Sequence, residues 1–137
     1  MPENRKFSVP LEAIDEIVRV SESGITATKM IHTEEPYLEG HYPDFTIYPG
    51  VFIMESVNQT VDAYVARVLG ADRIADLVAV MSARFTSPVL PGDTLQVSCQ
   101  VAVQGDDLAV EANCRTAAGA AAARLKLMYR ITGGGTR

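Results

Sequence analysis

A histidine and a glutamate lie close together in the stretch from Gly40 to Glu55, and both suit acid–base chemistry. His41 lies on a proline-punctuated loop and supplies an imidazole that titrates near neutrality. Pro49-Gly50 opens an apolar helix, whose first turn offers free backbone N–H groups and a positive dipole end. Glu55 follows on that helix, where apolar surroundings favour the protonated, proton-donating carboxyl. A base, an oxyanion-binding amide and an acid in this order suit adding water to a thioester, or removing it.

The helix that carries Glu55 is predicted over residues 50–69, because apolar residues recur there at three- and four-residue steps. Gly70 is expected to end it as a C-cap glycine. Glu55, Asn58, Gln59 and Asp62 form one polar stripe on this otherwise apolar helix. An unpaired buried charge is costly, so the stripe must face a cavity or a partner. We expect Gln59 to hydrogen-bond and orient the Glu55 carboxyl four residues away, whereas Asn58 and Asp62 stay open as interface polar groups.

The rest of the chain is predicted to be strand. Two strands at 13–20 and 25–32 precede the helix, and a third follows it at 77–85. Clear alternation of apolar and polar residues marks the last three strands, at 95–103, 108–116 and 121–131. One long buried helix must be wrapped by this antiparallel sheet of about six strands. The pattern therefore predicts an α+β protein with the hot-dog fold.

Composition limits the alternatives. The 137 residues, 47% apolar and 21% charged, indicate one domain over 1–137, with 1–10 and 133–137 as flexible ends. No apolar run is long enough to span a bilayer and the N-terminus lacks a signal-peptide pattern, so we expect a cytoplasmic protein that does not bind membranes. A net charge of −5 without a Lys/Arg cluster argues against nucleic acid as a partner. Cys99 and Cys114 are expected to be reduced core thiols.

Two sequence blocks resemble one family. The first is Gly40-His41-Tyr42-Pro43, then Tyr48-Pro49-Gly50-Val51, Glu55 and Gln59, and the second is Ala83-Arg84-Phe85, then Pro88-Val89-Leu90-Pro91-Gly92-Asp93. The beta-hydroxyacyl-acyl-carrier-protein dehydratases of type II fatty acid synthesis carry Gly-His-Phe-Pro-Gly, Met-Pro-Gly-Val, Glu and Gln, and then Ala-Arg-Phe and Pro-Val-Val-Pro-Gly-Asp, at the same spacing. The resemblance extends from about residue 13 to about residue 131.

The resemblance implies a role for each matching residue. The family's catalytic base corresponds to His41 and its catalytic acid to Glu55. Glutamate at the acid position points to the simple dehydratase branch, because the isomerising relatives carry aspartate there. The N–H that binds the thioester carbonyl falls on Gly50, and we expect Tyr48, Val51 and Gln59 to contact the substrate as well. The expected reaction removes water from a 3-hydroxyacyl thioester carried on an acyl carrier protein or coenzyme A. It gives the trans-2-enoyl thioester without a metal or redox cofactor.

The resemblance also implies a shared site, with the histidine from one protomer and the acid from its partner. We therefore expect a homodimer formed by edge-to-edge pairing of the two sheets, and we leave further assembly open. An acidic surface repels an acidic carrier protein, unless Arg67, Arg73, Arg84 and Arg124 gather into a basic patch. Arg84 and Asp93 are otherwise expected to be structural.

Two departures from the family pattern keep alternatives open. Asp44 replaces the family's glycine after His-Phe-Pro, and Thr46 replaces a proline two positions on. One alternative is a hot-dog thioesterase in which Glu55 activates water, and another is a non-catalytic protein that binds an acyl carrier. Polyketide or other secondary acyl-chain assembly fits as well as fatty acid synthesis. The acyl chain length depends on how Tyr48, Phe52, Met81 and Phe85 pack.

Overall fold

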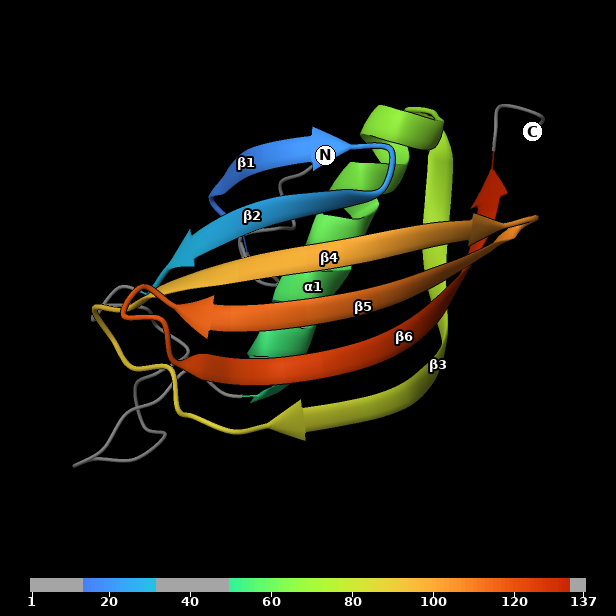
Figure 1. The fold of residues 1–137 in the computed structure, drawn as a ribbon. Coiled ribbons are helices and arrows are strands. Elements are labelled where there is room, and N and C mark those ends of the chain that lie inside the picture. Colours follow the sequence, from blue (N-terminus) through green and yellow to red (C-terminus); the bar gives the residue numbers. More distant parts are fainter. Residues whose placement is uncertain (1–13, 32–49, 134–137) are drawn as a thin grey trace, which may run out of the picture.

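The computed structural model describes residues 14–31 and 50–133, apart from the side chain of Val51. The elements follow the order β1 (Glu16–Ser21), β2 (Gly24–Met30), α1 (Gly50–Tyr64), a π-helical turn η3 (Val65–Leu69), β3 (Arg73–Phe85), β4 (Thr94–Gln104), β5 (Asp107–Thr116) and β6 (Ala121–Gly133). All strand pairs are antiparallel, and the sheet order is β1-β2-β4-β5-β6-β3. The sheet curves around α1 (Figure 1). The predicted arrangement of about six strands around one long helix is therefore confirmed.

The core lies between the concave face of the sheet and α1. Strand alternation sends every second side chain of β4, β5 and β6 inward. These side chains pack against the helix residues Ile53, Val57, Val61, Tyr64 and Val65. Cys99 and Cys114 are buried free thiols in this core, as predicted. Burial raises the pKa of each thiol to about 12, so both stay protonated and unreactive.

The helix prediction over 50–69 is confirmed, although its last five residues form the π-helical turn η3. Serine and threonine are tolerated on the buried face of α1 because their hydroxyls hydrogen-bond to backbone carbonyls of the same helix. Ser56 Oγ donates to the Phe52 carbonyl at 3.1 Å and Thr60 Oγ1 to the Ser56 carbonyl at 2.7 Å. Gly70 ends the helix, as predicted, with its N–H donating to the Val65 carbonyl at 2.9 Å and a positive φ of 148°.

Strands β3 and β6 extend beyond their predicted bounds. β3 begins at Arg73 rather than residue 77, and β6 runs to Gly133, which was predicted to belong to a loose tail. The two extensions pair with each other, since Arg73 lies opposite Gly133 in the register. A Cβ on Gly133 would lie 2.6 Å from the Asp72 carbonyl oxygen, so this close backbone approach requires glycine. At the other end of the chain, β1 begins at Glu16 rather than residue 13, and β2 ends at Met30 rather than residue 32.

Strand β3 forms one edge of the sheet and exposes many apolar side chains. Among the described strands its only partner is β6, so its outer backbone edge is unpaired there. Its exposed large apolar residues are Ile74, Leu77, Val78, Val80, Met81 and Phe85. A long apolar edge of this kind is a template for pairing with another strand. In the described ranges, no helix is long and apolar enough to cross a membrane.

Candidate active site

The predicted acid and its orienting residue are in contact on α1. Gln59 Nε2 donates a 3.2 Å hydrogen bond to Oε2 of Glu55. Both side chains are half-buried. A side-chain amide that holds one carboxylate oxygen restricts the rotation of the Glu55 carboxyl. The other oxygen is then oriented for proton transfer.

The two further members of the polar stripe have distinct surroundings. Asn58 Oδ1 accepts a 2.6 Å hydrogen bond from the hydroxyl of Tyr129, a buried β6 residue. Asp62 lies one turn beyond Asn58, and its pKa is raised from 3.8 to about 6. The causes are desolvation first, and then the negative charges of Glu55 and Asp76. The stripe therefore concentrates acidic groups around Glu55, and proton uptake by Asp62 near neutrality relieves part of that charge.

Gly50 begins α1 against the end of β3. A Cβ built on Gly50 would lie 3.4 Å from Cε1 of Phe85, which is ordinary van der Waals contact. Phe85 pairs with Ala123 in the register, a buried residue, so its side chain is on the concave face of the sheet. The N-terminal end of α1, with its free N–H groups, thus lies beside the Phe85 ring. This end precedes Glu55 by about one and a half helical turns. This arrangement suits an acyl thioester whose carbonyl meets the helix start.

Part of the predicted site cannot be placed. The predicted base His41 and the predicted substrate contact Tyr48 lie outside the described residues, as do Asp44 and Thr46. Val51 is placed on the first turn of α1 by its backbone. The structure therefore brings together Gly50, Glu55 and Gln59 on one helix.

The turn before β4 holds Ile31, the residue that follows β2, through two backbone hydrogen bonds. The Ile31 N–H donates to the Asp93 carbonyl at 2.9 Å, and the Gly92 N–H donates to the Ile31 carbonyl at 2.6 Å. Within the turn, Asp93 Oδ2 accepts the Leu90 N–H at 2.9 Å. The prediction that Asp93 is structural is therefore confirmed.

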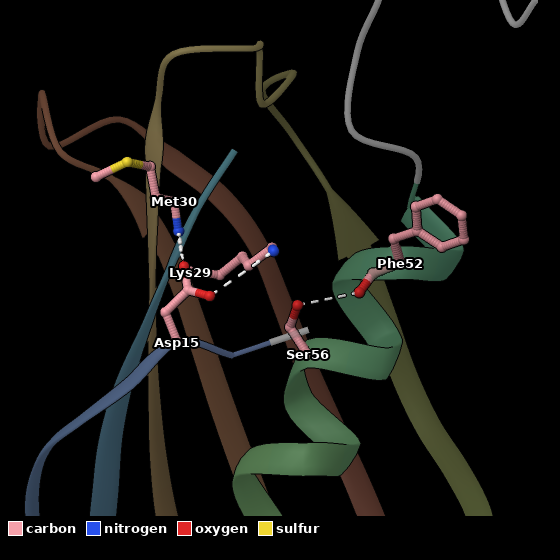
Figure 2. Close-up of polar contacts among 5 residues, drawn as sticks. All are labelled: Asp15, Lys29, Met30, Phe52 and Ser56. Carbon is pink, nitrogen blue, oxygen red and sulfur yellow. Dashed lines mark hydrogen bonds and ion pairs between the residues drawn. The ribbon is translucent and has the colours of Figure 1, made fainter. Parts of the chain in front are cut away.

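A buried lysine near the first turns of α1 was missed by the sequence analysis. Lys29 Nζ lies 3.8 Å from Oδ1 of Asp15, and Asp15 Oδ2 accepts the Met30 N–H at 2.7 Å. Figure 2 shows the Lys29 side chain extending from β2 toward the helix turn that carries Ser56. Lys29 is 4% exposed because it follows Ile25 and Ala27 on the inward face of β2. That alternation, carried two residues further along the strand, was the signal available in the sequence.

A family model matches residues 17–124, and its description is ApeI-like, the ApeI dehydratase. The chain is an ApeI-like dehydratase. The predicted resemblance to hot-dog thioester dehydratases is confirmed by this match and by the curated relatives of this dehydratase. One relative is the 3-hydroxyacyl-[acyl-carrier-protein] dehydratase FabZ of Solibacter usitatus, 32% identical over 124 residues. The match covers 89% of the dehydratase described here and 76% of the relative.

A further relative and two similar solved structures agree with this family and fold. FabZ of Agrobacterium fabrum is 37% identical over 90 residues, which cover 64% of this chain and 58% of that protein. The dehydratase heterocomplex ApeI:P from Xenorhabdus doucetiae has a TM-score of 0.72 and 15% identity, covering 88% of this chain and 82% of that chain. The PaaI protein of E. coli has a TM-score of 0.67 and 20% identity, and the match covers 84% of this chain and 81% of that chain. These structural likenesses show the fold, and the sequence match shows the family.

Proposed function

We propose that this dehydratase removes water from a 3-hydroxyacyl thioester attached to the phosphopantetheine arm of an acyl carrier protein, giving the trans-2-enoyl thioester. The observation that carries the proposal is the Glu55–Gln59 hydrogen bond of 3.2 Å on the helix that starts at Gly50. The names of the FabZ relatives, which specify this substrate class, support it. The family match supports the loss of water from the substrate, and the relatives' names support an acyl carrier protein as the group that carries the substrate.

The proposed mechanism is general acid–base catalysis. His41 takes the proton from the carbon next to the thioester carbonyl, while the Gly50 N–H donates to the carbonyl oxygen on which negative charge develops. Glu55, held by Gln59, gives its proton to the 3-hydroxyl, which leaves as water as the carbon–carbon double bond forms. Return of a proton from the His41 imidazolium to the Glu55 carboxylate resets the site. These groups complete the reaction without a metal or redox cofactor, and we place it in the cytoplasm.

We also propose a homodimer in which strand β3 pairs with its copy. The six exposed apolar side chains on this edge strand support that interface. Pairing there would cover the side of α1 that carries Glu55 and let a His41 of one protomer serve the Glu55 of the other. Equal mixing of His41→Ala and Glu55→Ala proteins should then restore activity through hybrid dimers. Subunit exchange without recovered turnover would show instead that each site belongs to one chain.

The proposed reaction is tested by incubating the protein with 3-hydroxyacyl carrier thioesters of increasing chain length. Mass spectrometry should detect loss of one water from the acyl group. Glu55→Gln should lower kcat by roughly 10²–10⁴, the usual contribution of a general acid. Asp62→Asn, a matched change on the same stripe, should keep kcat within about twofold of wild type, because Asp62 is not one of the proposed proton donors. Wild-type turnover by Glu55→Gln would refute the assignment, and release of free thiol without water loss would identify a thioesterase.

A further inference from the structure

We propose that Asn58 is a specificity-determining residue, whose side-chain amide selects 3-hydroxyacyl thioesters that carry a keto oxygen further along the acyl chain. Such an oxygen accepts hydrogen bonds from N–H donors, whereas a plain alkyl chain cannot. This inference rests on the proposed function, because it names the substrate class of the same site. It makes an alkyl chain of equal length the poorer substrate.

The first observation is the orientation of the Asn58 amide. Its Oδ1 accepts the 2.6 Å hydrogen bond from the hydroxyl of Tyr129, which is 1% exposed. A hydroxyl that donates to the carbonyl oxygen of an amide leaves both N–H groups of that amide for other acceptors. Contact with the sheet therefore assigns the oxygen of Asn58 to Tyr129 and leaves its nitrogen, Nδ2, for another group.

The second observation is that Nδ2 of Asn58 has no acceptor. Among the residues that the structure describes, the bond to Tyr129 is the one hydrogen bond of the Asn58 side chain. In the same described ranges, the one fully enclosed side-chain nitrogen or oxygen without a partner is Nε of Arg73. Nδ2 of Asn58 is therefore in contact with solvent rather than enclosed in the core. It offers two donors to a ligand that approaches α1.

The third observation is the helix face that Asn58 shares with the proposed acid. This face of α1 carries polar side chains spaced by three and four residues, namely Glu55, Asn58, Gln59 and Asp62. All four are half-buried or exposed, whereas Val57 and Val61 between them are fully buried. An alkyl chain laid along this face would displace water from polar groups without replacing the lost hydrogen bonds, which costs free energy. A chain with its own acceptor restores one of those bonds.

The rise of α1 gives the position of the oxygen on the acyl chain. The proposed roles of Gly50 and Glu55 run the chain from the helix start toward Asn58. A helix rises about 1.5 Å per residue, so Asn58 lies about 4.5 Å beyond Glu55 along the axis. An extended chain advances by roughly 1.2 Å per bond, since three backbone bonds span at most about 3.6 Å. With the 3-hydroxyl at Glu55, about four further bonds lead to the carbon beside Asn58, which is about carbon 7.

The test compares two acyl groups of equal length, 3-hydroxyoctanoyl and 3-hydroxy-7-oxooctanoyl, each attached to the same type II acyl carrier protein. The variant is Asn58→Leu, which keeps nearly the shape of asparagine without its donors. The matched control is Asn113→Leu, because Asn113 is also half-buried and its Oδ1 also accepts a hydrogen bond, from Arg124 at 3.0 Å. Asn113 lies on β5 between buried Ala112 and Cys114, so it faces away from α1.

We expect the wild-type kcat/KM to be about tenfold higher for the 7-oxo substrate, the effect of one hydrogen bond to a neutral group. Asn58→Leu should abolish this preference, because leucine offers no donor and suits the alkyl chain. Asn113→Leu should keep the preference. The double variant Asn58→Leu/Tyr129→Phe also removes the hydroxyl that Asn58→Leu leaves unpaired. It should therefore have a higher Tm than Asn58→Leu and still lack the preference.

Three outcomes would overturn the inference. They are a wild-type preference below about twofold, a preference that persists in Asn58→Leu even at lower activity, and a preference lost equally in Asn113→Leu. If the wild type dehydrates neither substrate, the proposed function fails and the selection is tested by calorimetric titration with the same two acylated carriers. A lower Kd for the 7-oxo group in the wild type, but not in Asn58→Leu, supports the inference. Equal Kd values for the two groups in the wild type refute it.

Discussion

The hydroxyl of Tyr129 on β6 donates a 2.6 Å hydrogen bond to Oδ1 of Asn58, and this bond joins the sheet to the middle of α1. The Tyr129 side chain is fully buried, and burial is the first cause of its raised pKa. Asn58 precedes Gln59, which holds the Glu55 carboxyl. The bond thus fixes the rotation of the helix whose polar stripe carries the proposed acid.

Breaking this bond from either side should destabilise the protein by different amounts. Asn58→Ala leaves a buried hydroxyl without its partner, which costs about 1–3 kcal/mol. Tyr129→Phe removes the donor and leaves the amide of half-buried Asn58 accessible to water, so we expect about 0.5–1.5 kcal/mol. Urea unfolding of both variants measures the free energies. Equal stability of Asn58→Ala and wild type would show that water replaces the Tyr129–Asn58 bond.

The raised pKa of Asp62 predicts a pH-dependent stability. The folded protein keeps the Asp62 proton up to about pH 6, whereas the unfolded chain releases it near its ordinary pKa of 3.8. Between these values the folded state binds more protons, so the contribution of Asp62 to the free energy of unfolding falls as the pH rises. Asp62→Asn should therefore be more stable than wild type above pH 6. Urea unfolding at a series of pH values should show this advantage disappearing below about pH 4.

The Gly50→Ala variant distinguishes an effect on the stability of the fold from an effect on the proposed contact with the thioester carbonyl. The added Cβ meets the Phe85 ring at ordinary contact distance, and alanine favours the helix. We therefore expect an unchanged or slightly higher Tm. The methyl group should hinder approach of a thioester carbonyl to the residue 50 N–H and lower kcat/KM by about tenfold or more. An unchanged kcat/KM would remove Gly50 from the site.

Gln59→Leu tests whether orientation of the acid matters. Loss of the 3.2 Å hydrogen bond frees the Glu55 carboxyl to rotate while leaving it in place. We expect kcat to fall by about tenfold with little change in KM, because a positioned acid acts mainly in the transition state. Steady-state kinetics measure both quantities. A rise in KM alone would make Gln59 a substrate-binding residue instead.

A charge on the β3 edge should prevent dimer formation. Val78 is 54% exposed on this edge, and Val18 is 52% exposed on β1, the opposite edge of the sheet. We expect Val78→Lys to be a monomer without activity and Val18→Lys to remain an active dimer. Sedimentation analysis at several protein concentrations distinguishes these states. A wild-type protein that sediments as a monomer would refute the proposed homodimer.

Local patterns in the sequence were enough to predict the helix, the strands and the Glu55–Gln59 contact. Glu55 and Gln59 are four residues apart, and helical geometry alone brings such side chains together. Alternation likewise predicted β4, β5 and β6, because a strand with one buried face must repeat every two residues. Periodicity therefore determined the secondary structure and part of the candidate site.

Only the tertiary structure decided which distant residues meet. Asn58 and Tyr129 are brought together by the packing of α1 on β6, and the pairing of Arg84 with Arg124 depends on strand order and register. Such contacts follow from how the helix and the curved sheet pack to exclude water from their apolar faces. Local sequence patterns carry no information on that choice between many alternative pairings.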